Sequence, residues 1–166
     1  MINYKLKYKL MTVDELFNFF KLKAPQIVNA ISTGAGWEIW LQTELILALR
    51  GANQGYSGAR ELPYPSPWDK SRLDIGIGHN QEYYAIEMKV ESATKTKPFL
   101  DRILKDVTKI GYYAVQGSDV KLSKYVVGIG FSIAAKAQMK QYSVDNAGQA
   151  GYCEQSGLGI LLIVVS

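Results

Sequence analysis

Alternation of apolar and polar residues marks several short stretches of the chain, and a period of two is typical of β-strands. The first stretch, INYKLKYKL at residues 2–10, places lysines on one face and tyrosines or leucines on the other, which predicts a half-exposed strand. Turn residues at 79–81 join two later stretches into a predicted hairpin. The strands predicted after the first are residues 59–64, 72–78, 82–90, 124–129 and 159–165.

Helical spacing of apolar residues predicts helices in the first third of the chain. Thr12 and Glu15 form a capping-box pattern for a short helix to about residue 22. Pro25 predicts the start of a second brief helix. Residues 37–50 carry apolar side chains on more than one side, so we expect this helix to be mostly buried.

Two further helices are predicted among the later strands. An amphipathic helix begins near Pro98, and another covers about residues 133–142. We expect the outer face of the first of these helices to carry Asp101, Arg102, Lys105, Asp106 and Lys109. The order of elements predicts an α/β fold in which a mixed sheet is covered by helices on both faces.

Composition narrows the possible chemistry. The chain has 166 residues, of which 48% are apolar and 20% charged, as in one ordinary globular domain. One cysteine and one histidine exclude an internal disulfide, a zinc cluster and paired imidazoles, so catalysis would need carboxylates, lysines or a metal. No long apolar run or leader-like segment is seen, so we expect a cytoplasmic protein without membrane association. The net charge of +4 is compatible with a polyanionic partner.

The predicted hairpin places charged side chains on one face of the sheet. Glu87 and Lys89 share a face of the second strand, and Asp74 lies on the first strand with Gly76. The other face of the hairpin is apolar, with Leu73, Ile75, Ile77, Tyr84, Ile86, Met88 and Val90. A tight turn pairs residue 79 with 82, 77 with 84 and 74 with 87, so the two carboxylates are predicted to face each other.

Two facing carboxylates destabilise a sheet unless a positive charge lies between them. The candidates are Lys89, Arg72 and a divalent cation. Gly76 and Ala85 are small and would leave room above the acids, which favours a Mg²⁺ site with oxygen ligands. The alternative is a structural network of ion pairs on a solvated face, and the expected burial of both faces argues against it.

These residues resemble the active-site motif of the PD-(D/E)XK nuclease superfamily, which has the restriction-endonuclease-like fold. RLDIGI resembles the part of the motif with the first acid, and AIEMKV resembles the E-x-K part, although Leu73 stands where the motif often has proline. GWEIWLQTEL resembles the family's leading helix, ARELPY its first strand and FLDRILKDVTKIGYY the helix after the E-x-K strand. The resemblance covers about residues 37–129.

The resemblance implies an αβββαβ core and metal-dependent hydrolysis of phosphodiester bonds, with DNA favoured over RNA. Residues 1–35 would extend a single domain, residues 36–130 would form its nuclease-like core, and residues 131–166 would add a helix and a strand. Mg²⁺, or Mn²⁺ in its place, would be held by Asp74, Glu87 and the backbone carbonyl of Met88. Either Glu38 or Glu44 of the leading helix, or Glu61, would complete an outer ligand shell. Lys89 would orient the attacking water, and the expected phosphate contacts are Lys95, Lys97, Arg102, Lys105 and Lys109.

A second hypothesis keeps the fold without the reaction. A small nuclease-fold protein can act as a binding partner, for instance as an immunity protein that neutralises a toxin, because fold alone does not establish function. The strand predicted at residues 2–10 could pair with the edge of another chain, in a protein complex or in a homodimer. The intact set of Asp74, Glu87 and Lys89 favours catalysis.

Overall fold

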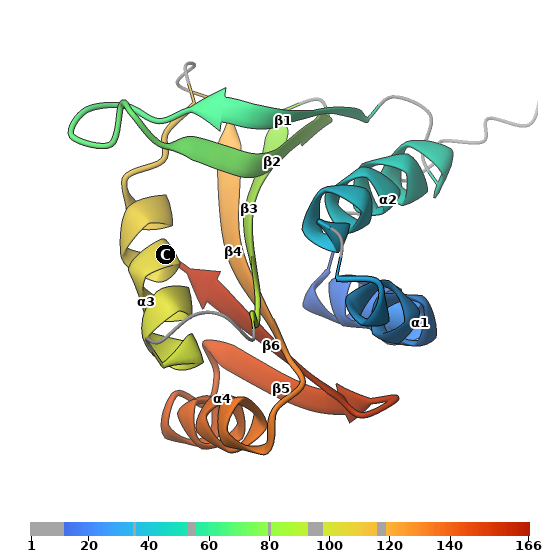
Figure 1. Cartoon of the computed structure of the whole chain (residues 1–166). Coiled ribbons are helices and arrows are strands. Elements are labelled where there is room, and N and C mark those ends of the chain that lie inside the picture. The colour runs from blue at the N-terminus through green and yellow to red at the C-terminus, as the bar shows by residue number, and fades with distance from the viewer. Residues whose placement is uncertain (1–11, 35, 53–55, 80, 93–97, 116–118) are drawn as a thin grey trace, which may run out of the picture.

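The computed structural model describes residues 12–34, 36–52, 56–79, 81–92, 98–115 and 119–166, which form an α/β fold (Figure 1). The helices are α1 (Val13–Ser32), α2 (Trp37–Ala52), α3 (Phe99–Gly111) and α4 (Ile133–Asp145). The strands are β1 (Ser57–Pro63), β2 (Arg72–His79), β3 (Glu82–Val90), β4 (Lys121–Gly130), β5 (Ala150–Gln155) and β6 (Leu158–Val165).

The strands form one six-stranded mixed sheet in the order β1-β2-β3-β4-β6-β5. Only β3 and β4 pair in parallel, and α3 is the crossover that connects them. Helices α1 and α2 cover one face of the sheet, and α3 and α4 cover the other (Figure 1). The predicted α/β class and the covering of both faces are therefore confirmed.

The two faces of the sheet belong to two separate apolar clusters. Tyr84, Ile86 and Met88 of β3 pack in the cluster under α1 and α2, whereas Tyr83 and Ala85 pack in the cluster under α3 and α4. The predicted alternation of β3 is confirmed, and the charged side chains of this strand contact residues of α3. The register of the hairpin matches the prediction for residue 79 opposite 82 and residue 77 opposite 84, but the predicted pair of 74 with 87 is not part of the ladder, which ends at residue 75.

Helix α1 differs from the predicted pair of short helices. The Thr12 and Glu15 capping box is present, but the helix continues through Pro25 as one element of 20 residues. Its buried stripe of Leu16, Phe20, Ala24 and Ile27 has helical spacing and packs against the sheet. A proline inside a helix costs about 3 kcal/mol, and we attribute the continuous helix to burial of this stripe, which exceeds that cost.

Two other elements differ from what the sequence indicated. Helix α2 was predicted to be mostly buried, but it also presents apolar side chains to solvent, with Ile39 57% exposed and Leu47 55% exposed. The Gly-rich segment before β6 contains a strand, β5, which pairs with β6 at the edge of the sheet and includes Cys153. The strand predicted at residues 2–10 lies outside the described residues. In the part of the chain that the structure describes, no helix combines the length and apolar character that a membrane crossing requires.

Candidate functional site

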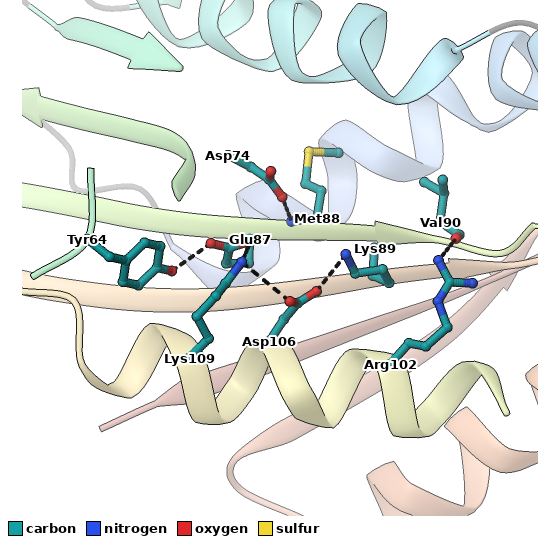
Figure 2. Close-up of polar contacts among 9 residues, drawn as sticks. All are labelled: Tyr64, Asp74, Glu87, Met88, Lys89, Val90, Arg102, Asp106 and Lys109. Atoms are coloured by element: carbon teal, nitrogen blue, oxygen red, sulfur yellow. Dashed lines mark hydrogen bonds and ion pairs between the residues drawn. The ribbon is translucent and has the colours of Figure 1, made fainter. Parts of the chain in front are cut away.

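The candidate site lies along β3, where Glu87 and Lys89 contact the inner face of α3 and Asp74 of β2 contacts the β3 backbone (Figure 2). Asp74 comes from β2, Glu87 and Lys89 come from β3, and Asp106 and Lys109 come from α3. Figure 2 shows Glu87 between Tyr64 and Lys109, and Asp106 between Lys109 and Lys89. The charged groups therefore form a chain of alternating sign from β3 to α3.

Pairing of β2 is interrupted on both sides at Asp74. The pairs with β1 run from residue 78 to residue 75 and resume at Leu73, and the pairs with β3 end at residue 75. On β1, Glu61 lies at the interruption and has a φ of 57°, a left-handed conformation that is uncommon for a residue with a side chain. Leu73 packs on the α3 side, although alternation predicted it on the same side as Ile75 and Ile77. Such breaks re-aim side chains and are frequent near functional sites.

The interruption lets the Asp74 carboxylate contact the backbone of β3. Asp74 Oδ2 accepts a hydrogen bond of 2.7 Å from the Met88 N–H, in place of a ladder pair between residues 74 and 87. Burial raises the pKa of Asp74, and the Met88 hydrogen bond opposes only part of this shift. Asp74 is therefore held in one orientation by the strand that also carries Glu87.

Glu87 is a buried carboxylate with a partner on each oxygen. Its side chain is 1% exposed. The Tyr64 hydroxyl donates to Oε1 at 2.6 Å, and the Lys109 ammonium donates to Oε2 at 3.0 Å. Burial raises the pKa of Glu87 to about 8, and the charge of Asp74 adds to the shift, against the opposing effect of Lys109 and Tyr64.

The two lysines of the site share one carboxylate. Lys89 Nζ lies 2.9 Å from Asp106 Oδ2, as an ion pair without hydrogen-bond geometry, and Lys109 Nζ lies 3.4 Å from Asp106 Oδ1. Burial alone would lower the pKa of Lys109, but the charge of Glu87 and its hydrogen bond outweigh burial and raise it. The predicted outer position of Asp106 and Lys109 was wrong, since both lie against the sheet.

Among the other expected phosphate contacts, Lys105 is exposed on α3, as predicted. Arg102 turns toward the sheet, where its guanidinium donates to the Val90 carbonyl at 3.5 Å and lies over the Phe99 ring. The expected contacts Lys95 and Lys97 lie outside the described residues.

Only one of the three additional acids approaches the site. Burial raises the pKa of Glu38, on α2, to about 7, and the negative charge of Asp74 contributes to this shift. Glu44 instead pairs with Lys23 of α1 at 2.5 Å, where it links the two helices. The Glu61 side chain is 59% exposed and lies 3.6 Å from the Arg60 guanidinium. Among the described residues, neither Glu44 nor Glu61 joins Asp74 and Glu87 in a group of three acids that could hold a metal ion.

The carboxylate oxygens of the site suit a hard cation such as Mg²⁺, although few protein ligands are available to it. Among the described residues, no group of three or more histidine, cysteine or acidic side chains is close enough to hold one metal ion. Mg²⁺ commonly takes one or two carboxylates and completes its shell with water and substrate oxygens. Burial is the main cause of the raised pKa values of Asp74 and Glu87, and a bound cation would oppose it by favouring the ionised carboxylates. The space predicted above Gly76 is filled by Tyr83 and Leu62, so it offers no room for an ion.

Tyr64 and Asp106 were not among the site residues predicted from the sequence, and Lys109 was predicted on the opposite face of α3. A signal for Asp106 was present, because the buried positions of α3 are 99, 103, 106 and 110, a helical stripe that includes this acid. An acid within a buried stripe needs a partner. Tyr64 lies between two prolines in the segment after β1, and no periodicity indicated its contact with Glu87.

Comparisons of the chain with protein-family models, with curated proteins and with solved structures found no match.

The pH dependence of stability tests the environment of Glu38. Its folded-state pKa of about 7 lies above the ordinary value of 4.5, so the folded protein retains a proton that the unfolded chain loses. The contribution of Glu38 to the stability of the metal-free protein is therefore full below about pH 4.5 and is lost as the pH rises through about 7. We expect Glu38→Gln to match the wild type near pH 4 and to exceed it by roughly 2 kcal/mol at pH 8.

Urea unfolding in EDTA across this pH range measures the effect. Glu61→Gln, at an exposed position of β1, is the matched control and is expected to follow the wild type at every pH. Identical pH profiles for Glu38→Gln and the wild type would show that Glu38 is solvated and remote from Asp74.

Proposed function

We propose that this protein is a metal-dependent nuclease that hydrolyses phosphodiester bonds, with DNA favoured over RNA. The observation that carries the proposal is the pair of Asp74 and Glu87, two carboxylates with raised pKa values on adjacent strands at the point where β2 leaves its ladder. The order α2-β1-β2-β3-α3-β4 supports an αβββαβ core of the restriction-endonuclease-like type. The resemblance of residues 37–129 to the PD-(D/E)XK superfamily points to the same chemistry.

In this proposal Asp74 and Glu87 hold Mg²⁺ or Mn²⁺, with the Met88 carbonyl as a further ligand. A bound ion of this kind lowers the pKa of a coordinated water and neutralises charge that develops on the phosphate. The Met88 N–H fixes Asp74, and Tyr64 and Lys109 fix the two oxygens of Glu87. Glu38, with a pKa of about 7, is suited to exchange a proton near neutral pH.

The test is degradation of linear duplex DNA, single-stranded DNA and tRNA by the purified protein, with Mg²⁺ or Mn²⁺ against EDTA. We expect cleavage that requires the metal and is lost in Asp74→Ala. Thermal unfolding of each variant establishes that it is folded. No cleavage of any substrate by the wild type, with either metal, would overturn the proposal.

A second candidate function is a binding protein without catalysis. It is favoured by the ion pairs that the charged residues form with one another. Glu87 is 1% exposed, and Lys89 and Lys109 are ion-paired within the protein. If the protein only binds a partner, the wild type should cleave no nucleic acid with either metal, and Asp74→Ala should behave in the same way. The same assay therefore separates the two functions.

A further inference from the structure

The E-x-K pattern on β3 predicts that Lys89 acts beside Glu87, but among the described residues the lysine that forms an ion pair with Glu87 comes from another element. Lys109 of α3 lies 3.0 Å from Glu87 Oε2. Lys89 lies 2.9 Å from Asp106 Oδ2 instead. The two lysines have different partners, and Glu87 is paired with the one from the helix.

Three contacts fix the Lys109 ammonium in this position. It donates to Glu87, it lies 3.4 Å from Asp106 Oδ1, and it lies 5.4 Å from the centre of the Tyr64 ring. The Tyr64 hydroxyl donates to the other oxygen of Glu87, so one tyrosine holds both members of the pair. The Lys109 side chain is 14% exposed and that of Lys89 is 24% exposed. Lys109 is therefore the more buried and the more constrained of the two.

We propose that Lys109, and not Lys89, is the lysine that positions the Glu87 carboxylate for the reaction, and that Asp106 holds Lys89 away from it. This inference rests on the proposed function, because it assigns a role within the same site. Lys109 acts through Glu87: it orients Oε2 and balances the charge of the carboxylate. A donor already fixed in the folded protein needs no reorganisation during the reaction. Asp106 carries one lysine on each oxygen and sets the spacing between them.

A thermodynamic cycle tests the pairing without any need for catalysis. Lys109→Met and Lys89→Met are each made in the wild type and in Glu87→Gln, and the midpoint of thermal unfolding is measured in EDTA. We expect Lys109→Met to lower the midpoint by roughly 5 °C or more in the wild type, and by less than about half as much in Glu87→Gln. Lys89→Met should lower it equally in both backgrounds, to within about 2 °C.

Kinetics on the nucleic acid that the wild type cleaves test the functional part. Lys109→Met should lower kcat by roughly 100-fold with little change in KM, and its loss should be about tenfold greater than that of Lys89→Met. Lys109→Arg keeps the charge and should recover part of the loss, which a purely structural role would not predict. If Lys109→Met does not fold, Lys109→Arg and the double variant with Glu87→Gln take its place.

The outcomes separate this inference from the proposed function. Coupling of Glu87 to Lys89 rather than to Lys109, or a larger kinetic loss in Lys89→Met, would overturn the inference while the nuclease proposal stands. Absence of cleavage by the wild type would overturn the nuclease proposal and with it the positioning role of Lys109 in the reaction. The thermal cycle would then still decide which lysine is the partner of Glu87.

Discussion

Replacement of Asp74 by asparagine is expected to abolish metal-dependent cleavage and, at the same time, to raise the stability of the metal-free protein. In the proposed function Asp74 holds the metal, so its replacement would remove several kcal/mol of transition-state stabilisation and lower the rate by at least about 1,000-fold. Asparagine keeps an oxygen that can accept the Met88 N–H. It carries no charge, so it removes the effect by which Asp74 raises the pKa of Glu87.

The sign of the stability change follows from the pKa of Asp74. Burial raises that pKa in the folded protein, so the ionised carboxylate is disfavoured by folding, and stability is lost as the pH rises above its ordinary value of 3.8. At pH 8 the neutral asparagine avoids this loss. We therefore expect a higher unfolding midpoint for Asp74→Asn than for the wild type at pH 8 in EDTA.

Opposite changes in activity and stability distinguish a catalytic site from a structural ion network. In a structural network, removal of one member leaves its partner unpaired and lowers stability. Asp69→Asn, at an exposed position between β1 and β2, is the matched control and should change neither property. A lower midpoint for Asp74→Asn with unchanged cleavage would identify the acids of β2 and β3 as a stabilising network.

Local patterns in the sequence were sufficient to predict the hairpin that carries the site. The turn at residues 79–81 and the alternation on both sides of it determine which residues lie opposite one another. The observed pairs, residue 77 with 84 and residue 79 with 82, agree with this prediction. The break at Asp74 could not be predicted in this way, because it depends on β1. There Glu61 adopts a left-handed conformation opposite Asp74, and nothing in ARELPY indicates it.

The partners of Glu87 could not be predicted from sequence spacing for a related reason. Lys89 is two residues away along the strand, whereas Lys109 reaches Glu87 only because α3 packs across β3 and β4. Crossover packing depends on tertiary contacts such as that of Ile103 with Gly128, where a Cβ atom would have no room. A charge pattern on one strand can therefore predict where the site lies without showing which lysine pairs with its carboxylate.

Helix α1 illustrates how burial overrides a local signal, and Phe20→Ala is expected to show it. Pro25 predicted a helix boundary, yet one helix continues because Phe20 and its neighbours on the stripe are buried under the sheet. The Phe20 side chain is 0% exposed, and removal of a buried phenylalanine typically costs 3–5 kcal/mol, so we expect a loss of about 4 kcal/mol. Urea unfolding measures this loss.

Leu22→Ala is the matched control on the same helix. Leu22 is 80% exposed, so its truncation should change the free energy of unfolding by no more than about 0.5 kcal/mol. A helix sustained by its intrinsic propensity would respond little to either change, because alanine favours helices at least as well as phenylalanine or leucine. A large loss in Phe20→Ala alone would show that contact with the sheet holds α1 together across Pro25. Equal and small effects would instead place α1 outside the cooperative core.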